Sequence, residues 1–343
     1  MIEHNMTRPL VSVVIVTHNA SQTLQHCLKS IARSTYTNIE VILVENASKN
    51  NIYALLIKEF PSVNITYIRN SQNVGHAEGF NKGFRVATGE YIMKVDDDVE
   101  VDKFCIEALV TYLQNNPEVA IVQPLILHKE NDQYLPVGSL QLDILGFEHP
   151  IVDTSIRKAF YAAGAAFMIR RKSLEQASLG TCFFDPDYFI YYDDVDACWR
   201  LRLATGLDIH VIYSAKAYHI PIKKATQRTH ARYVYFHTRN KLMTLIKNYR
   251  INDLIKYMPI LTLLDIGRVF IYLLINPEAG FAIIRGYIWN LLNLKKILKK
   301  RAIVWFCLKK VYDKEIYTAM TKINFRESYK VFMKQIKKHI SKE

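Results

Sequence analysis

The sequence lacks the features that would place it in an oxidising compartment. Its five cysteines are scattered and include no Cys-x-x-Cys pair, so we expect free thiols in a reducing compartment rather than a disulfide framework. The first ten residues, MIEHNMTRPL, contain no apolar segment, and we expect no signal peptide there. We therefore expect the main folded part of the chain to face the cytoplasm.

A long uninterrupted apolar run is also missing. A membrane-spanning helix needs about 18 to 20 such residues; residues 254–275 and 281–294 come closest, but charged residues interrupt both. The basic run 295–301, with the sequence KKILKKR, follows directly. Apolar helices beside a cationic cluster are typical of segments that lie in a membrane interface. A helical bundle packed on the rest of the chain and a dimer interface are the alternatives. The interrupting residues are Lys256, Asp265, Arg268 and Arg285.

The net charge of +13 is unevenly distributed. Residues 1–222 contain 19 Lys and Arg against 25 Asp and Glu, a net charge of −6, whereas residues 223–343 contain 26 against 7, a net charge of +19. Nucleic-acid phosphates would repel the acidic part, so we expect no nucleic-acid partner. The basic part favours an anionic membrane surface.

Short apolar runs alternate with amphipathic segments over the first two thirds of the chain. This pattern predicts βαβ units, and hence an α/β fold with a mostly parallel sheet flanked by helices. We expect loops with a hairpin over residues 125–160. The predicted strands are Val11–Thr17, Glu40–Val44, Ile65–Ile68, Tyr91–Val95, Val119–Val122, Gly164–Ile169 and Ile209–Tyr213, and the predicted helices are Leu24–Ala32, Ile52–Phe60, Ala77–Val86, one that begins near Cys105, and Asp193–Thr205.

Three adjacent carboxylates, Asp96, Asp97 and Asp98, follow the apolar run Tyr91–Val95. Adjacent negative charges repel one another unless a cation or hydrogen-bond donors neutralise them. At the carboxyl end of a strand they lie where open α/β sheets bind ligands. Oxygen ligands suit Mg²⁺ or Mn²⁺, and such an ion usually bridges to substrate phosphates. The alternative is a solvated loop that caps the next helix.

Polar side chains follow two other predicted strands, at what should be the same edge of the sheet. Thr17 and Asn19 end the first strand, and Glu45 and Asn46 end the second. The Glu45 carboxylate can accept a hydrogen bond from a nucleobase N–H. It can equally cap the following helix, as Ser48 can.

Three further signals are weaker. Asn73 and Gly75 precede a predicted helix, so backbone amides there can approach a nucleotide, although such a pair often forms only a turn. His219 follows a strand-like stretch and is a candidate metal ligand or phosphate contact, against a purely structural role. Arg239 lies in the basic aromatic stretch YVYFHTRNK and is a candidate partner for a diphosphate.

Asp194 opens the predicted helix Asp193–Thr205. Its carboxylate can cap that helix and interact with the helix dipole. It can also act as a general base that takes the proton of an acceptor hydroxyl, because the neighbouring Asp193 and Asp196 would raise its proton affinity. Both interpretations stay open on the residues alone.

The order of these pieces resembles family 2 glycosyltransferases, in particular the rhamnosyltransferase-like group that builds cell-surface glycans. The resemblance covers roughly residues 10–245, and its specificity comes from eight segments in the right order rather than from any one of them. The segments are VSVVIVTHN, EVILVENAS, NSQNVGHAEGFNKGF, ATGEYIMKVDDDVE, GAAFMIRR, FFDPDYFIYYDDVDACWRLR, YHIP and YFHTRNKL.

The resemblance implies a GT-A fold, an NDP-sugar donor, a divalent metal and inverting transfer of one sugar to a glycan or lipid-linked acceptor. It implies that Asp96 and Asp98 are the ends of a D-x-D motif that touches ribose and metal, and that Asp194 is the catalytic base. It also implies a set of donor contacts. These are Thr17, Asn19, Glu45 and Asn46 at the nucleobase and ribose, and Asn73, Gly75 and Asn81 along the donor pocket.

Two departures from the family pattern matter. Glu45 stands where such proteins usually have Asp, so nucleobase contacts would come from a longer side chain. No Q-x-x-R-W motif occurs near residues 225–245; that motif accompanies processive synthases, so we expect single-sugar addition. Asp193-Asp194 replaces the commoner Glu-Asp, which changes little.

These observations predict a catalytic domain over residues 1–245 and a helical basic region over 246–343, held peripherally at the cytoplasmic face of the cell membrane. A nucleotidyltransferase is a second enzyme class with acidic metal ligands on an α/β sheet, but residues 17–22 offer no Gly-rich, Lys-bearing loop. A catalytically inactive relative that only binds sugar nucleotides is the third alternative, and the intact set of carboxylates disfavours it.

Overall fold

A computed structural model of the chain describes residues 8–19, 22–49, 59–61, 63–130, 133–220 and 227–321. Its strands in chain order are β1 (Val11–Thr17), β2 (Ile39–Asn46), β3 (Asn64–Asn70), β4 (Tyr91–Asp96), β5 (Val99–Val101), β6 (Val119–Glu130), β7 (Gln133–Val137), β8 (Ser139–Leu142), β9 (Glu148–Ile151), β10 (Lys158–Ala159), β11 (Ala166–Arg170) and β12 (Asp208–His219).

The helices follow in the same numbering, with η1 a short 3₁₀ helix and η2 a π-helical turn. They are α1 (Gln22–Ala32), α3 (Gly75–Val86), α4 (Cys105–Asn115), α5 (Arg171–Ala177), η1 (Pro186–Tyr188), α6 (Asp193–Thr205), α7 (Gln227–Asn248), α8 (Ile251–Ile275), α9 (Pro277–Leu292), α10 (Leu294–Ile303), η2 (Val304–Leu308) and α11 (Asp313–Ala319).

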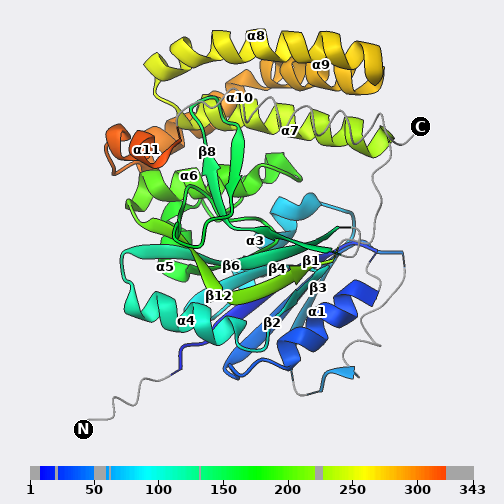
Figure 1. Cartoon of the computed structure of the whole chain (residues 1–343), viewed down its shortest axis with the longest axis vertical. Helices are drawn as coiled ribbons and strands as arrows, with labels where there is room; N and C mark the ends of the chain where they lie inside the picture. The colour runs from blue at the N-terminus through cyan, green and yellow to red at the C-terminus, as the bar shows by residue number, and fades with distance from the viewer. Residues whose placement is uncertain are drawn as a thin grey trace.

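One large mixed sheet forms the centre of the molecule (Figure 1), with strand order β10-β12-β6-β11-β4-β1-β2-β3. Strands β4, β1, β2 and β3 are parallel, as the alternating pattern predicts. Strand β11 runs antiparallel between β4 and β6. Because β1 aligns Thr17 with Glu45 and Val16 with Asp96, the predicted polar strand ends lie side by side at one edge.

Each face of the sheet carries its own apolar core, because successive strand side chains point to opposite faces. Val13 and Ile15 of β1 pack in the core that α1 and α4 cover. Val14 points the other way and joins a core that includes Phe80 of α3 and Trp199 of α6. The apolar strand runs are thus buried on both sides, as expected of a covered parallel sheet.

The expected hairpin within residues 125–160 is present, but the chain there is more regular than expected, because it forms two hairpins. Strand β6 continues to Glu130 and pairs with β7, and β8 pairs with β9. Pro136 and Pro150 lie in β7 and β9, which are edge strands, where a proline removes no ladder hydrogen bond. The predicted helix at 52–60 lies almost entirely outside the described residues.

Helix α7 is the element that the sequence pattern misses. Its buried positions include Thr238, Asn240, Lys241, Thr244 and Lys247, each no more than 1% exposed. Because these polar residues are buried beside apolar ones such as Val234, Leu242 and Leu245, the apolar positions of the helix stand out poorly in a periodicity search.

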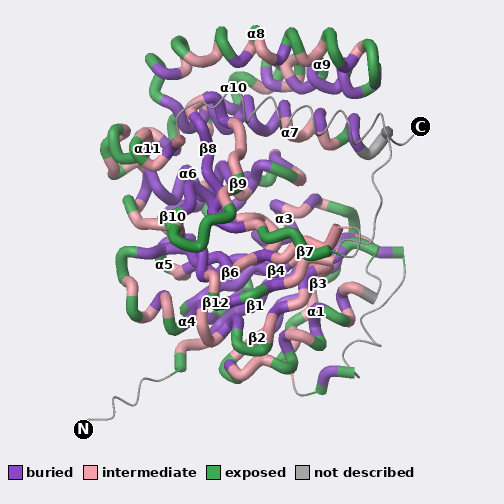
Figure 2. Tube along the Cα trace, viewed as in Figure 1, coloured by how far each residue is buried: buried purple, intermediate pink, exposed green. Residues whose placement is uncertain are grey.

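Helices α7 to α10 form a layer on top of the sheet domain (Figure 1). The predicted domain boundary at residues 245 and 246 falls inside α7, and the apolar core is continuous across it: Leu242 of α7, Leu261 of α8 and Ile297 of α10 belong to the same core as Trp199. Figure 2 shows that α8 exposes much of its outer surface. By length and composition α8 is apolar enough to cross a membrane, with 17% of its most apolar window buried.

Candidate functional site

The carboxyl ends of β1, β2 and β4 bring the predicted polar residues together. Thr17 Oγ1 donates a hydrogen bond of 2.6 Å to Asp97 Oδ2, which joins the end of β1 to the carboxylate cluster. Asn46 is 2% exposed, and its side-chain amide donates to the Gly75 carbonyl at 2.9 Å, joining β2 to the start of α3. Open α/β sheets bind ligands at such an edge.

The loops after β1 and β2 are tied to each other. The Asn19 backbone amide donates to Ser48 Oγ at 2.8 Å, and the side-chain oxygen Asn19 Oδ1 accepts from the Lys49 backbone amide at 3.1 Å. Glu45 accepts from the Ser48 amide at 2.7 Å and from the Tyr67 hydroxyl. Glu45 is thus tied to the loop after β2 and to β3, and it is only 5% exposed. The helix that it was predicted to cap, at 52–60, lies almost entirely outside the described residues.

Asp96 lies in a charged cluster with two residues that the sequence did not single out. Lys94 Nζ is 2.5 Å from Asp96 Oδ1, and His76 Nε2 is 3.1 Å from the same oxygen. The other ring nitrogen of His76 is 3.1 Å from Asp193 Oδ2. Burial would raise the pKa of Asp96, but Lys94 and His76 outweigh it and hold that pKa below its usual value. Between its two carboxylates, the pKa of His76 is raised to about 9, against the effects of burial and of Lys94.

Asp97 and Asp98 face different partners. Burial raises the pKa of Asp97 to about 6, with its acidic neighbours adding to the shift and Thr17 opposing it. Asp98 Oδ1 is 3.3 Å from His219 Nε2, and His219 Nδ1 is 3.1 Å from His128 Nδ1. The pKa of His219 is raised because Asp98 outweighs its burial.

The donor chemistry at this edge fits a divalent cation that is shared with a substrate. Within the described part of the chain, no three His, Cys, Asp or Glu side chains converge on one metal position. Asp98 and His219 supply an oxygen and a nitrogen within 3.3 Å of each other. Mg²⁺ is commonly held by one or two carboxylates, with waters and substrate phosphates completing the shell, so Asp98 and His219 can form the protein's share without a third converging ligand.

Asp194 lies at the start of α6 beside the β11 end of the sheet. Its Oδ2 accepts from the Gly164 amide at 2.9 Å and its Oδ1 from the Val195 amide at 2.8 Å. A Cβ on Gly164 would lie 3.2 Å from the Asp194 carboxylate, which explains the small residue there. Burial raises the pKa of Asp194 to about 7, and the nearby charges of Asp193 and Glu148 add to the shift. A carboxylate with this pKa can exchange a proton near neutral pH.

The start of α3 is shaped by the chain segment that precedes α6. Asn73 Oδ1 accepts from the Gly75 amide at 2.9 Å, which is the turn that the sequence allowed. Gly75 has φ +86°, and a Cβ there would lie 2.7 Å from the Phe189 carbonyl oxygen. The neighbouring His76 amide donates to that carbonyl at 2.7 Å. Gly75 is thus required by backbone approach, and it places His76 between the two acidic groups.

Two residues that we predict to contact the donor lie in the interior instead. Asn81 is 0% exposed, and its side-chain amide both donates to the Phe184 carbonyl and accepts from the Phe184 amide. Arg239 is 6% exposed, donates to the carbonyls of Asp187 and Tyr188, and lies over the Trp289 ring. Both side chains hold the segment between Phe184 and Tyr188 in place, so we do not retain them as donor contacts.

His76, Lys94 and Glu148 are the residues of the site that sequence reasoning missed. Lys94 had a signal: a lysine inside the apolar run YIMKV is buried and needs a counter-charge, and strand periodicity puts Asp96 on its face. His76 lies inside a segment used for the family resemblance. Glu148 has no such signal, because a hairpin brings it to the site from a stretch expected to be loop.

Comparison with known proteins agrees with this geometry. Residues 12–177, a little under half of the chain, match the family model "Glycosyl transferase family 2". The chain is 32% identical over 124 residues to the glycosyltransferase GlyG of Streptococcus pneumoniae, covering 36% of this chain and 41% of that protein. It is 23% identical over 215 residues to the poly-beta-1,6-N-acetyl-D-glucosamine synthase of Staphylococcus epidermidis, covering 60% and 48%. The chain thus spans less than half the length of these curated relatives.

Among solved structures, the chain is similar to the mannosyltransferase PcManGT of Pyrobaculum calidifontis, determined with GDP-Man and Mn²⁺. The TM-score is 0.55 at 16% identity, with 87% of this chain and 86% of that chain covered. A likeness at this identity concerns the fold. The sheet therefore has the GT-A fold, and residues 12–177 of the chain are similar to family 2 glycosyltransferases.

The raised pKa of Asp194 makes a prediction about stability. Its folded-state pKa of about 7 exceeds the value of about 3.9 for an unfolded chain, so the folded protein binds the proton more tightly and gains stability as the pH falls through 7. Asp194→Asn removes the buried charge and keeps an acceptor for one of the two amide hydrogen bonds, because its NH2 group cannot accept the other. We expect it to raise the melting temperature at about pH 8 and to lose most of that gain by about pH 5. Glu118→Gln, at an exposed position, should change neither; an equal effect of Asp194→Asn at both pH values would contradict the shift.

Proposed function

We propose that the protein transfers a single hexosyl or rhamnosyl residue from an NDP-sugar to a hydroxyl of a glycan or lipid-linked acceptor, with inversion at the anomeric carbon. The observation that carries the proposal is the link from Asp96 through His76 to Asp193, beside Asp194. It supports a single cleft in which the carboxylates of the D-x-D sequence and a basic carboxylate face the same substrate. The rhamnosyltransferase-like resemblance suggests the sugar class.

The residues divide the work as follows. Thr17, Asn19 and Asn46 line the strand ends where the nucleobase and ribose would lie. Asp96, Asp98 and His219 would hold Mg²⁺ or Mn²⁺, whose positive charge stabilises the leaving diphosphate when it is bound. The presence of Mn²⁺ in the PcManGT structure supports this cofactor class.

Asp194 takes the proton from the acceptor hydroxyl as its oxygen attacks the anomeric carbon. The Gly164 and Val195 amides fix the orientation of the carboxylate. The new glycosidic bond forms as the bond to the diphosphate breaks on the opposite face, which inverts the configuration. The diphosphate leaves with the electron pair, and the proton remains on Asp194 until solvent removes it.

We further propose that the helical layer holds the enzyme on an anionic membrane surface, where a lipid-linked acceptor is located. Two of the charges that interrupt α8 point inward: Asp265 is 1% exposed and pairs with Arg268 at 2.6 Å and with the Tyr287 hydroxyl at 3.0 Å. The outward face is apolar instead, the reverse of a soluble surface helix. Exposed apolar side chains on α8 and α9 include Ile255, Leu263, Phe270, Leu274, Phe281, Leu291 and Leu292.

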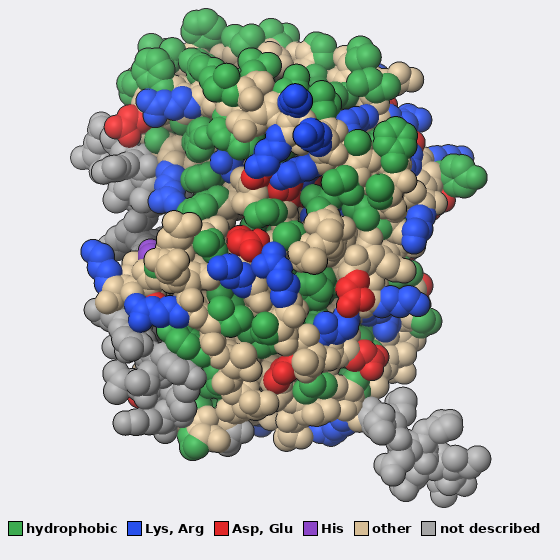
Figure 3. All heavy atoms as spheres, turned by 180° about the vertical axis from the view of Figure 1, so that it is seen from behind, with side chains coloured by type: hydrophobic (Ala, Val, Ile, Leu, Met, Phe, Trp, Pro, Cys, Tyr) green, Lys and Arg blue, Asp and Glu red, His purple; other side chains and the backbone are tan. Residues whose placement is uncertain are grey.

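Figure 3 shows hydrophobic side chains gathered over the end of the molecule that α8 and α9 form, with basic groups below them. Lys256 of α8, Arg285 of α9 and Lys295 of α10 are exposed, and each basic residue near an anionic surface contributes about 1 kcal/mol. The cationic contribution is smaller than the run at 295–301 suggests, because Lys300 and Arg301 make contacts inside the protein. Interfacial attachment fits better than a spanning helix, which would place Asp265 and Arg268 in hydrocarbon.

The metal-binding part of the proposal predicts the effect of removing carboxylates. Asp98→Ala and Asp96→Ala should each abolish the Mn²⁺-dependent part of UDP or dTDP affinity, because the diphosphate loses its bridging cation. Isothermal calorimetry with and without Mn²⁺ measures this, with Glu118→Gln as the control and the melting temperature checked for each variant. Unchanged affinity in both Asp variants would refute the metal site.

The base assignment predicts a different signature for Asp194→Asn. Donor affinity should stay within about twofold, whereas the transfer rate should fall by about 10²-fold or more, the usual scale for a lost general base. Asparagine caps helices well, so a purely capping role would leave transfer nearly normal. Transfer is measured with a panel of UDP-, GDP- and dTDP-sugars and a soluble acceptor.

Membrane attachment predicts that the outward apolar face of α8 is necessary for vesicle binding. The full-length protein should co-sediment with vesicles that contain phosphatidylglycerol, and less with phosphatidylcholine alone. Replacing Leu263, Phe270 and Leu274 together by Glu should leave the protein in the supernatant. The matched control replaces three exposed apolar residues of the sheet domain, Val86, Tyr134 and Val152, by Glu. If the wild type does not co-sediment, or if both triple variants partition alike, the face instead packs against protein.

A further inference from the structure

The segment between η1 and α6 has an unfavourable backbone conformation that needs support from neighbouring elements. Phe189, Tyr191 and Tyr192 have φ values of +62°, +66° and +65°. Residues other than glycine rarely adopt such positive φ values. Such residues persist only where the surrounding structure fixes them. Asp193 and Asp194 follow directly, so whatever holds this segment also sets the position of the base.

Helices α3 and α7 provide part of the support. The His76 and Ala77 amides donate to the Phe189 carbonyl at 2.7 and 3.4 Å. The Asn240 side-chain amide of α7 lies 2.9 Å from the Ile190 carbonyl and 2.7 Å from the Tyr191 carbonyl. These contacts act on the left-handed residues themselves, from two sides.

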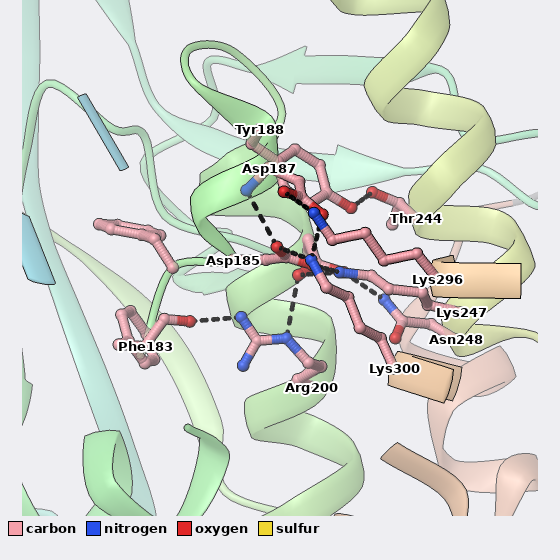
Figure 4. A network of polar contacts seen from close by, with 12 residues as sticks. Phe183, Asp185, Asp187, Tyr188, Arg200, Thr244, Lys247, Asn248, Lys296 and Lys300 are labelled. Carbon is pink, nitrogen blue, oxygen red and sulfur yellow. Dashed lines mark hydrogen bonds and ion pairs between the residues drawn. The ribbon is translucent and has the colours of Figure 1, made fainter. Parts of the chain in front are cut away.

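The remaining support comes from α10, which lies more than a hundred residues after η1 in the sequence. Lys300 Nζ contacts Asp185 Oδ1 and lies 2.5 Å from Asp187 Oδ2, and Lys296 Nζ is 2.6 Å from Asp187 Oδ1. Figure 4 shows both lysines reaching across to the turn at η1. The lysines and the carboxylates they meet are more than a hundred residues apart in sequence. Thus Lys296 and Lys300 of the basic run 295–301 both pair with carboxylates of the protein; the Lys296 side chain stays exposed, whereas Lys300 is largely buried.

The same network continues under the turn into α6. Lys247 Nζ of α7 is 2.7 Å from Asp185 Oδ2 and 3.0 Å from Asp196 Oδ2, and Arg200 Nε is 2.9 Å from the same Asp196 oxygen. Asp185, Asp196 and Lys247 have fully buried side chains. Without Lys300, Asp185 would share its only other ammonium partner in the described structure, Lys247, with Asp196. A buried carboxylate with incomplete compensation is costly, so the turn would shift toward water.

We propose that Lys300 is a positioning residue for Asp194: its ammonium fixes the Asp185–Tyr188 turn, and this turn fixes the left-handed segment that presents the base. The inference rests on the proposed function only for the role of Asp194; the mechanical part concerns the fold alone. It makes α10 part of the apparatus that orders the site, and not only part of a membrane attachment.

The test compares three full-length variants. Lys300→Met keeps the length and apolar bulk of the side chain but removes the charge, and Lys300→Arg keeps a cation. Lys299→Met is the matched control, because Lys299 is the exposed neighbour on the same helix. Amide hydrogen exchange is measured by mass spectrometry on peptides that cover residues 185–196, together with donor affinity and the transfer rate to a water-soluble acceptor.

We expect Lys300→Met to raise exchange in residues 185–196 by about tenfold, on the scale of one lost charge-assisted hydrogen bond, while β1 to β4 stay protected. The transfer rate should fall by about tenfold with donor affinity within about twofold. Lys300→Arg should recover most of the loss, and Lys299→Met should behave as the wild type. In an Asp194→Asn background, Lys300→Met should cost little further transfer, since residues that act through one group are not additive.

Exchange that is the same in Lys300→Met and Lys299→Met would overturn the inference, whatever the activity. A multiplicative loss of transfer in the Asp194→Asn background would also overturn it, because Lys300 would then act on something other than the base. If the wild type transferred no sugar from any donor, the proposed function would fail, and the exchange result would still decide whether Lys300 orders the turn.

Discussion

The structure depends on how it compensates negative charge in a confined space. Asp96, Asp97 and Asp98 lie near Asp193 and Asp194 at one edge of the sheet. Carboxylates so close to one another cannot all ionise unless cations or backbone amides neutralise them. The chain supplies different partners to different members. Lys94 and His76 form ion pairs with Asp96, whereas Asp194 accepts hydrogen bonds from two backbone amides. This asymmetry separates their proton affinities, so that one carboxylate stays ionised while another can accept a proton near neutrality.

A second set of carboxylates, Asp185 and Asp196, lies in the interior next to the segment that leads to Asp193 and Asp194. Asp185 and Asp196 are buried with Lys247 between them, and Arg200 and Lys300 complete the compensation. A buried ion network of this kind is not an efficient source of stability, but it tolerates few alternative arrangements. In this protein it joins α6, α7 and α10 around the turn at η1 that leads to Asp194.

Much of the sheet and of its polar edge follows from sequence, because β-branched runs and short spacings fix parallel strands and parallel strands align their ends. Thr17, Asn46 and Asp96 were therefore expected together, and they are. The roles of Asn81 and Arg239 were not predictable, since whether a polar side chain faces a pocket or a backbone carbonyl depends on the approach of segments far away in the chain. Helix α7 was missed for a related reason: its buried surface mixes polar residues such as Asn240 and Lys247 with apolar ones, and the polar residues find their partners in segments far away in the chain.

The contact between α10 and η1 has a consequence for how the protein is made. Lys300 and Asp185 are 115 positions apart, and contacts of such separation form late because the intervening chain must first be ordered. During synthesis the sheet can assemble while the C-terminal helices are still within or near the ribosome, since domains generally fold from the N-terminus as the chain emerges. The turn at η1 would then be completed only after α10 has been made. A nascent chain would thus form the carboxyl-end edge of its sheet before the segment that precedes Asp194 is fixed in place.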